Sequence, residues 1–207
     1  MTTGPVHGTR PVIATIVLAA GGSSRMSGGH KLLEILGGRP VIALSVGAAL
    51  DAELGPVLVV TGDRSPDVEA ALPPGVAVIQ NPDWRSGMAS SLRLATLDLP
   101  ETVDAFAVAL GDMPLVRATH YRALAGAWTS GSVAVPVHEG RRGHPVIWSR
   151  EFASGMGDLR GDRGARVLLE RHTDRVIEVE MEDRGVLVDV DTREQLDAVR
   201  SGLSRGG

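Results

Sequence analysis

A glycine-rich loop near the N-terminus carries residue types that fit phosphate chemistry. Gly21 and Gly22 follow an apolar, β-branched run that predicts a buried strand. Arg25 and Lys31 come a few residues later. Glycines leave backbone N–H groups open to an anion because no side chain blocks the approach, and two cations add charge-assisted hydrogen bonds. The segment therefore predicts a cradle for a triphosphate.

The loop differs from two better-known phosphate-binding loops. It lacks the Lys-Ser/Thr ending of the P-loop, and Gly21, Gly22 and Gly28 do not fit the spacing of the dinucleotide fingerprint. A glycine-rich segment by itself is equally typical of a flexible surface loop after a core strand. The choice between these interpretations depends on other segments of the chain.

Three aspartates are candidate metal ligands. Asp112 comes just after the apolar run 103–110, and Asp189 and Asp191, two residues apart, are expected on one side of a strand. Mg²⁺ prefers one or two carboxylates and takes water and phosphate oxygens as its other ligands. The alternative is that these aspartates cap turns or a helix. The pattern leaves open which of Asp189 and Asp191 completes the site.

Two further segments are candidates for binding the substrates. Asn81 precedes a proline in a predicted turn, and Ser90 is expected in the first turn of the next helix, where hydroxyls and free N–H groups hold a base or a phosphate. Helix capping by Ser86 is the alternative, and Trp84 is expected to pack in the core. His144 is expected to orient a second substrate rather than to act as a base, since a phosphate nucleophile is already an anion.

Several segments together resemble the MobA-like nucleotidyltransferases, and within them the molybdenum cofactor cytidylyltransferases. One departure is Ser27, where that family usually has glycine. The matching segments occur in the family's order and span most of the chain: Leu18–Gly21, Arg25–Met26, Lys31–Leu33, Asn81–Trp84, Gly87–Leu92, Gly111–Pro114, Gly143–Val146 and Asp189–Thr192.

The resemblance implies transfer of CMP from CTP to the terminal phosphate of molybdopterin, with Mg²⁺ as cofactor and release of pyrophosphate. It implies catalytic roles for Arg25, Lys31 and Asp112. It implies that the nucleotide contacts Leu18, Ala19, Ala20, Gly21, Gly22, Ser23, Arg25, Lys31, Asn81 and Ser90. The acceptor is expected at Gly143, His144 and Pro145, and the metal at Asp112 with Asp189 or Asp191.

Two other functions remain open at this point. A sugar-phosphate nucleotidyltransferase would share the cradle and the metal-binding aspartate but would differ in its acceptor pocket. A non-catalytic carrier or insertion chaperone would bind the finished dinucleotide cofactor. The combination of Arg25, Lys31 and Asp112 favours catalysis, because a carrier has no need of cations for a leaving group. A molybdoenzyme or its maturation chaperone is the expected protein partner.

Composition indicates a compact globular protein. The 207 residues are 43% hydrophobic, enough to bury one core, and the formal net charge of −4 argues against nucleic acid as a partner. The chain has no cysteine, which excludes disulfides and thiolate catalysis. We see no signal peptide and no apolar stretch of the roughly 18–20 residues that span a membrane, so we expect a cytoplasmic location.

Strand-like and helix-like segments alternate along the chain, which predicts a largely parallel sheet covered by helices on both faces. The resemblance implies the same fold class, a single-domain, Rossmann-like, three-layer α/β/α fold related to nucleotide-diphospho-sugar transferases. We expect one domain over residues 11–201, with flexible tails at 1–10 and 202–207. The expected strands are 12–20, 56–61, 76–80, 103–110, 132–137, 145–148, 176–181 and 185–190, and the expected helices are 39–51, 65–72, 88–97, 119–128 and 192–203.

Overall fold

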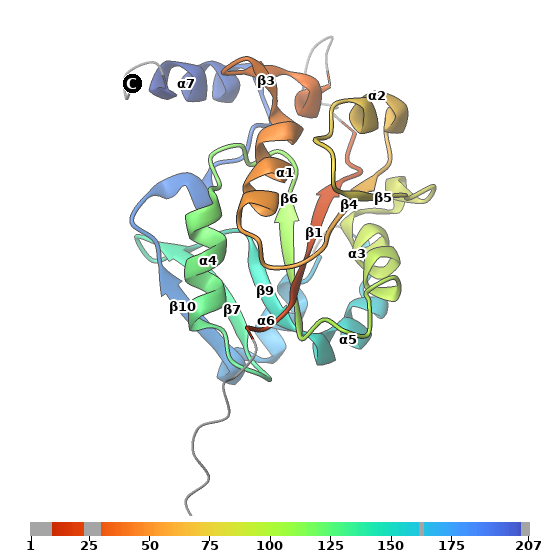
Figure 1. The fold of residues 1–207 in the computed structure, drawn as a ribbon, viewed down its shortest axis with the longest axis vertical. Coiled ribbons are helices and arrows are strands. Elements are labelled where there is room, and N and C mark those ends of the chain that lie inside the picture. The colour runs from red at the N-terminus through yellow and green to blue at the C-terminus, as the bar shows by residue number, and fades with distance from the viewer. Residues whose placement is uncertain (1–9, 23–29, 162–163, 204–207) are drawn as a thin grey trace, which may run out of the picture.

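One twisted sheet with helices on both faces forms the centre of the computed structural model, which describes residues 10–22, 30–161 and 164–203 (Figure 1). The eight-stranded sheet has the order β10-β7-β9-β6-β1-β4-β5, and β8 pairs with β7 at the side. Its strands are β1 (Ile13–Ala19), β4 (Val57–Thr61), β5 (Ala77–Gln80), β6 (Ala105–Leu110), β7 (Val133–His138), β8 (Arg141–Arg142), β9 (Val146–Ser149) and β10 (Val176–Glu180).

The central strands are parallel and apolar on both faces. β1 lies between β4 and β6 and pairs with both in parallel, with Leu18 opposite Val60 on one side and Leu110 on the other. Strands covered on both sides read as continuous apolar runs, which explains the sequences of β1 and β6. β5 is the exception, because this edge strand is largely exposed, contrary to the expectation that it is buried on both faces.

Helices form the two outer layers, which confirms the predicted three-layer α/β/α fold (Figure 1). One apolar cluster joins a face of the sheet to α1 (Val41–Asp51), α2 (Ser65–Ala70) and α4 (Ala118–Ala127). The second cluster joins the opposite face to α3 (Met88–Leu97), α5 (Ala153–Gly157) and α6 (Arg166–Arg171).

The segment 133–149 reverses direction within the sheet. β9 pairs antiparallel with both β6 and β7, and β8 folds back onto β7. This excursion is the departure from an all-parallel sheet, since β10 again pairs in parallel with β7.

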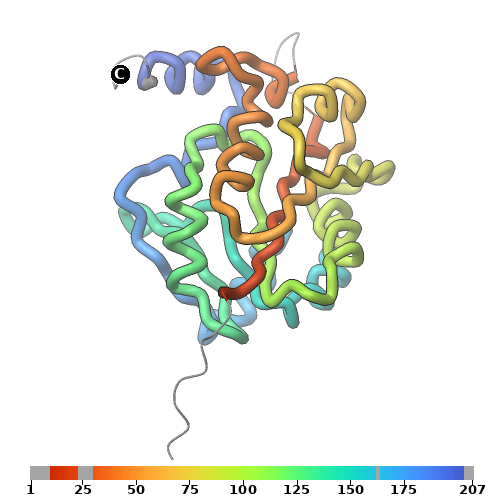
Figure 2. Tube along the Cα trace, in the orientation of Figure 1, coloured from red at the N-terminus to blue at the C-terminus, as the bar shows by residue number. Residues whose placement is uncertain are grey.

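The last helix, α7 (Arg193–Leu203), packs beside a small two-stranded sheet of β2 (Ile35–Leu36) and β3 (Arg39–Pro40) (Figure 2). The Arg200 guanidinium donates to the Ile35 carbonyl at 2.7 Å, and Leu196 is buried against Leu36. The C-terminal segment thereby returns to the edge of the sheet from which the N-terminal loop leaves.

Several element predictions need correction. The expected strand at 185–190 is instead a 3-10 turn, η6 (Arg184–Leu187), followed by irregular backbone. The short helices α5 and α6 are absent from the prediction. Most of both expected tails lies outside the described residues, although α7 continues to Leu203. Within the described ranges, none of the helices has the length and apolar character needed to cross a membrane.

Candidate active site

The carboxyl ends of β1 and β6 meet at one edge of the sheet, where ligands of open α/β sheets bind. The Gly111 N–H donates to the Leu18 carbonyl at 2.9 Å, so the loop after β1 and the turn after β6 leave the sheet side by side. A Cβ at Gly111 would lie 2.7 Å from Ile42 Cδ1 and 3.1 Å from the Leu18 carbonyl oxygen, so a larger residue there would require the Ile42 side chain to shift. The contact places Asp112 beside the glycine loop.

Lys31 joins two carboxylates that are far apart in the sequence. Its Nζ lies 2.5 Å from Asp112 Oδ2 and 2.6 Å from Asp191 Oδ1. Burial by itself would lower the pKa of Lys31, but Asp112 and then Asp191 favour the ammonium and hold this pKa above its usual range. Lys31 is therefore a fixed positive charge at this edge of the sheet.

The start of α7 fixes the position of Asp191. The Gln195 side-chain oxygen accepts hydrogen bonds from the backbone N–H groups of Asp191 and Thr192, and Thr192 Oγ1 accepts one from the Gln195 N–H. This reciprocal pattern is a capping box. One residue earlier, the Val190 N–H donates to the Asp112 carbonyl at 2.9 Å, which ties the segment to the turn after β6.

Asp189 does not share the position of Asp191. In the described residues, no hydrogen bond or ion pair joins Asp189 to Lys31, and no three His, Asp or Glu side chains are grouped so that they could hold a metal ion. The expectation that Asp189 and Asp191 point to one side assumed a strand. The backbone is irregular there and turns into α7, so the alternation of a regular strand does not apply to these two residues.

A cavity of about 590 Å³ opens at the same edge of the sheet. It brings together seven of the residues that the sequence predicts: Leu18, Ala19, Ala20, Gly21, Gly22, Lys31 and Asp112. Ser23 and Arg25, also predicted, lie outside the described residues. One oxygen of Asp112, Oδ1, is buried and has no hydrogen-bond partner within the described part of the chain, so it remains available to a ligand.

Trp84 and Arg85 also line the cavity, and sequence reasoning missed both. Trp84 was expected only to pack; it does contact Gly22, where an added Cβ would lie 3.0 Å from the indole. The Arg85 guanidinium lies 4.2 Å from the centre of the Trp84 ring, a cation–π contact. An aromatic residue followed by a cation, just before a glycine at a helix start, is the signal that could have identified them.

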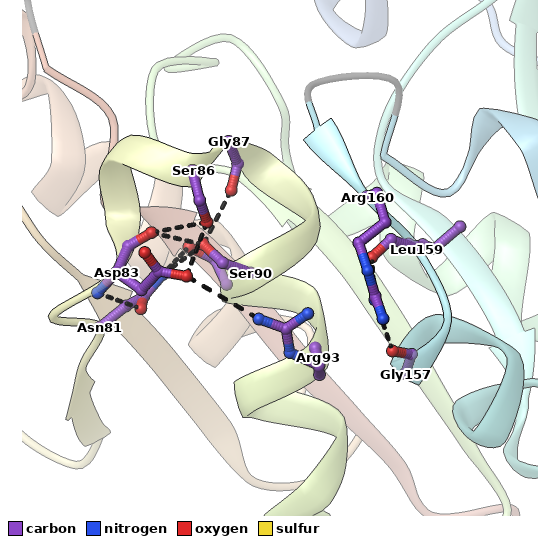
Figure 3. Close-up of polar contacts among 10 residues, drawn as sticks. Asn81, Asp83, Ser86, Gly87, Ser90, Arg93, Gly157, Leu159 and Arg160 are labelled. Carbon is purple, nitrogen blue, oxygen red and sulfur yellow. Dashed lines mark hydrogen bonds and ion pairs between the residues drawn. The ribbon is translucent and has the colours of Figure 1, made fainter.

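Asn81 and Ser90, predicted to bind the nucleotide, are buried and do not line the cavity; they belong to a hydrogen-bond network at the start of α3 (Figure 3). Asn81 Nδ2 donates to Ser90 Oγ at 2.8 Å, and Ser90 Oγ lies within 3.1 Å of the Asp83 and Gly87 carbonyls. Ser86 bonds to Asp83 and does not cap α3. The network fixes the turn that presents Gly87, Met88 and Ser91 to the cavity.

Gly143 and His144 line a second cavity next to the first. Pro145 is buried and follows His144 through a cis peptide bond. The His144 N–H donates to the Val186 carbonyl at 2.9 Å. Burial lowers the pKa of the His144 imidazole, and the Val108 carbonyl and Asp112 only partly oppose this. His144 is therefore uncharged at neutral pH, which agrees with an orienting role.

Two known proteins are similar to this chain over nearly its whole length. The Nicotine blue oxidoreductase of Paenarthrobacter nicotinovorans is 30% identical over 196 residues, which cover 90% of this chain and 95% of that protein. The Purine catabolism protein PucB of Bacillus subtilis (strain 168) is 31% identical over 207 residues, which cover 94% and 98%.

Solved structures share the whole fold. The crystal structure of Rv0371c from Mycobacterium tuberculosis H37Rv superposes with a TM-score of 0.83 at 25% identity and covers 93% of this chain and 100% of that one. A structure of the same protein in complex with manganese has a TM-score of 0.80 at 25% identity and covers 91% and 98%.

The fold is the Rossmann-like α/β/α fold of the nucleotide-diphospho-sugar transferases, and the first cavity lies at the carboxyl ends of β1 and β6, where ligands of such sheets bind. The sequence profile described as the MobA-like NTP transferase domain matches residues 15–176. The chain therefore belongs to the MobA-like NTP transferase family, and the resemblance noted in the sequence is confirmed at the level of the family.

Proposed function

We propose that this protein transfers CMP from CTP to the terminal phosphate of molybdopterin and releases pyrophosphate. The observation that carries the proposal is the meeting of Lys31, Asp112 and Asp191, because Lys31 and Asp112 line the same cavity as Gly21 and Gly22. A positive charge and two carboxylates beside open backbone amides suit a reaction that depends on holding phosphates and neutralising their charge.

In the proposed complex the nucleotide lies in the first cavity. The base contacts Leu18, Ala19 and Ala20, where β1 ends, and the triphosphate follows Gly21 and Gly22 towards Lys31. Arg25 is proposed to add a second cation. Asn81 and Ser90 support the opposite wall through the turn before α3, so we assign them a positioning role.

We propose that Mg²⁺ is held by Asp112 and Asp191. The residues fit the ion, because Mg²⁺ accepts two carboxylates plus phosphate and water oxygens, and Asp112 Oδ1 has no protein partner among the described residues. Bound there, Mg²⁺ would offset negative charge on the triphosphate. The manganese complex of Rv0371c supports a divalent ion in this fold.

The acceptor is proposed to enter from the side of Gly143, His144 and Pro145. An oxygen of its terminal phosphate forms the new bond to the α-phosphorus of CTP, while the bond from that phosphorus to the bridging oxygen breaks and pyrophosphate leaves. The neutral His144 ring and the backbone around it orient the acceptor, and no base is needed because the nucleophile is an anion. Lys31 stabilises the charge that develops on the leaving group.

The test measures pyrophosphate release with molybdopterin as acceptor and CTP, GTP, ATP or UTP as donor. We expect turnover with CTP and Mg²⁺, and loss of nearly all turnover in folded Asp112→Asn. Asp191→Asn should raise the Mg²⁺ concentration needed for half-maximal activity, whereas the matched control Asp189→Asn should not, because Asp189 does not contact Lys31.

Three outcomes would replace the proposal with another function. Pyrophosphate release with a sugar 1-phosphate but not with molybdopterin would indicate a sugar-phosphate nucleotidyltransferase. Consumption of NADPH without pyrophosphate release would indicate an oxidoreductase, the activity in the name of one relative. Tight binding of the finished dinucleotide with no turnover would indicate a carrier.

Location and delivery follow from the proposed reaction. We propose that the protein acts in the cytoplasm, where CTP is available, and passes its product to a molybdoenzyme or to the maturation chaperone of that enzyme.

A further inference from the structure

Positive charge is scarce in the first cavity. In the described part of the chain, Lys31 and Arg85 are the two cationic residues that line it. Lys31 already contacts two carboxylates, those of Asp112 and Asp191, so these three side chains together carry a net negative charge. A triphosphate brings further negative charge to the same place. Binding it therefore calls for a cation that is not already compensated by the protein.

Arg85 is such a cation. Within the described ranges, neither a hydrogen bond nor an ion pair joins its guanidinium to another residue. Asp83, the acidic residue nearest to it in the sequence, instead accepts from Ser86 Oγ at 2.8 Å and lies 3.9 Å from Arg93 (Figure 3). The Arg85 side chain is exposed. Its positive charge is available to an anion in the cavity.

Trp84 fixes where Arg85 stands. The guanidinium carbon of Arg85 lies 4.2 Å from the centre of the Trp84 ring, a cation–π contact. The edge of the same ring contacts Gly22, where an added Cβ would lie 3.0 Å from it. The turn that carries both residues, η2 (Trp84–Ser86), is held by the hydrogen bond from Asn81 Nδ2 to Ser90 Oγ and its neighbours. Arg85 is thus held beside the glycine loop.

We propose that Arg85 is a phosphate-binding residue: its guanidinium, held on the Trp84 ring, donates hydrogen bonds to non-bridging oxygens of the triphosphate in the first cavity. This inference rests on the proposed function, which assigns the nucleotide to that cavity. A guanidinium is always charged, and its planar N–H groups match the geometry of phosphate oxygens. Trp84 is a positioning residue, because it acts on the phosphates through Arg85.

Calorimetric titrations without acceptor test the contact. The probes are CTP with Mg²⁺, inorganic tripolyphosphate with Mg²⁺, which lacks the base, and cytidine, which lacks the phosphates. For Arg85→Gln we expect the Kd for CTP and for tripolyphosphate to rise about ten- to thirtyfold at low salt, because a charge-assisted hydrogen bond is lost. The Kd for cytidine should stay within twofold. An unchanged affinity for CTP would overturn the inference, and so would an equal loss of affinity for cytidine.

Arg93→Gln is the matched control. It removes the same charge from the same region, but Arg93 lines neither cavity and lies beside Asp83 (Figure 3). We expect all three affinities to stay within twofold of wild type. A loss as large as that of Arg85→Gln would mean that only the overall charge of the protein matters, and the inference would fail.

Salt separates lost charge from lost packing. Screening between exposed charges acts over about 8 Å at 0.15 M ionic strength and over about 3 Å at 1 M. The difference in tripolyphosphate affinity between wild type and Arg85→Gln should therefore shrink as salt is added, and Arg85→Lys, which keeps the charge, should recover part of the lost affinity. A difference that is independent of salt would contradict a charged contact.

The role of Trp84 is tested in two backgrounds. Trp84→Leu should weaken the binding of tripolyphosphate when Arg85 is present, because the guanidinium loses the ring that holds it. In Arg85→Gln the same substitution should change the Kd by less than twofold. Equal weakening in both backgrounds would mean that Trp84 acts on the glycine loop by itself and does not position Arg85.

Kinetics separate this inference from the proposed function. With molybdopterin as acceptor, Arg85→Gln should lower kcat/KM for CTP about ten- to thirtyfold and leave the KM for molybdopterin within twofold of wild type. A raised KM for molybdopterin with unchanged CTP binding would assign Arg85 to the acceptor and overturn the inference. If wild type does not use molybdopterin, the proposed function fails, whereas the affinities for CTP and tripolyphosphate still decide the role of Arg85.

Discussion

Lys31 separates two carboxylates that would otherwise repel each other. Its Nζ contacts Asp112 and Asp191, and the three side chains are between 15% and 24% exposed. In such a partly buried site the attraction is screened less than at the surface, and loss of the cation leaves uncompensated negative charge. Substitution of Lys31 is therefore expected to affect stability as well as catalysis.

We predict that Lys31→Met lowers the free energy of unfolding by about 1–3 kcal/mol at low salt. Millimolar Mg²⁺ should restore much of this loss, because a divalent ion between the two carboxylates can replace the ammonium. Thermal unfolding with and without Mg²⁺ checks this without any measurement of activity. The control is Lys31→Met combined with Asp191→Asn, in which Mg²⁺ should have little effect; equal Mg²⁺ responses in both variants would contradict the metal assignment.

Ala20 is the residue at which we expect the choice of base to be sensitive. Ala20 is 6% exposed and lines the first cavity. A Cβ added at Gly62 would lie only 2.9 Å from the Ala20 Cβ. We predict that wild type prefers CTP over GTP in kcat/KM and that Ala20→Gly reduces this preference by about 1–3 kcal/mol or less, the usual range for a methyl-sized change. Competition assays at fixed Mg²⁺ measure the ratio. Equal use of both nucleotides by wild type would refute the base assignment.

At the scale of elements, the close approach of the β8–β9 turn to η6 shapes the acceptor side. A Cβ at Gly143 would lie 2.1 Å from the Val186 carbonyl oxygen, and the next residue donates a backbone hydrogen bond to that same oxygen. The position of the C-terminal segment that carries Asp191 therefore depends on Gly143, which lies between β8 and β9. Stability and acceptor binding should change together when this contact is disturbed.

We predict that Gly143→Ala destabilises the protein and raises the KM for the acceptor more than the KM for CTP, because the backbone contact cannot accommodate a methyl group. The matched control is Gly126→Ala, in the last turn of α4, where no atom outside the helix backbone lies within 4 Å of the added Cβ. That change should raise stability by up to about 1 kcal/mol, since alanine favours a helix. Chemical denaturation and steady-state kinetics measure both effects, and a neutral Gly143→Ala would show that η6 shifts easily.

For the whole molecule, two histidines with lowered pKa values, His30 and His144, link stability to pH. Burial is the main cause that lowers the pKa of both His30 and His144 in the folded protein. In the unfolded chain a histidine titrates near about 6.5. Below that pH the unfolded chain binds protons that the folded protein does not. The contribution of the two histidines to the free energy of unfolding is therefore fully present above about pH 6.5 and is lost as the pH drops through the folded pKa.

We predict that the melting temperature falls between pH 7.5 and pH 5.5 and that His144→Gln reduces this fall. For each histidine, the free energy of unfolding falls by at most about 1.4 kcal/mol per pH unit below pH 6.5, until the folded pKa is reached. The double variant with His30→Gln should reduce the fall further. Calorimetric melting at several pH values measures it, and a profile that neither substitution alters would assign the pH dependence to other groups.

The sequence by itself determined the layers of the fold and the cradle. Continuous apolar runs predicted β1, β4 and β6, and helical spacing predicted α1, α3 and α4, because these signals are local and depend only on which faces are buried. The sequence also singled out Gly21, Gly22, Lys31 and Asp112, and these residues line one cavity where the carboxyl ends of parallel strands meet.

Only the tertiary structure decided how distant segments complete the site. It paired Asp191 rather than Asp189 with Lys31, because the start of α7 and the Val190–Asp112 hydrogen bond fix the direction of that backbone. It buried Asn81 and Ser90 away from the cavity lining and placed Trp84 and Arg85 on it. These outcomes depend on packing between elements far apart in the chain, which local patterns of residue types do not encode.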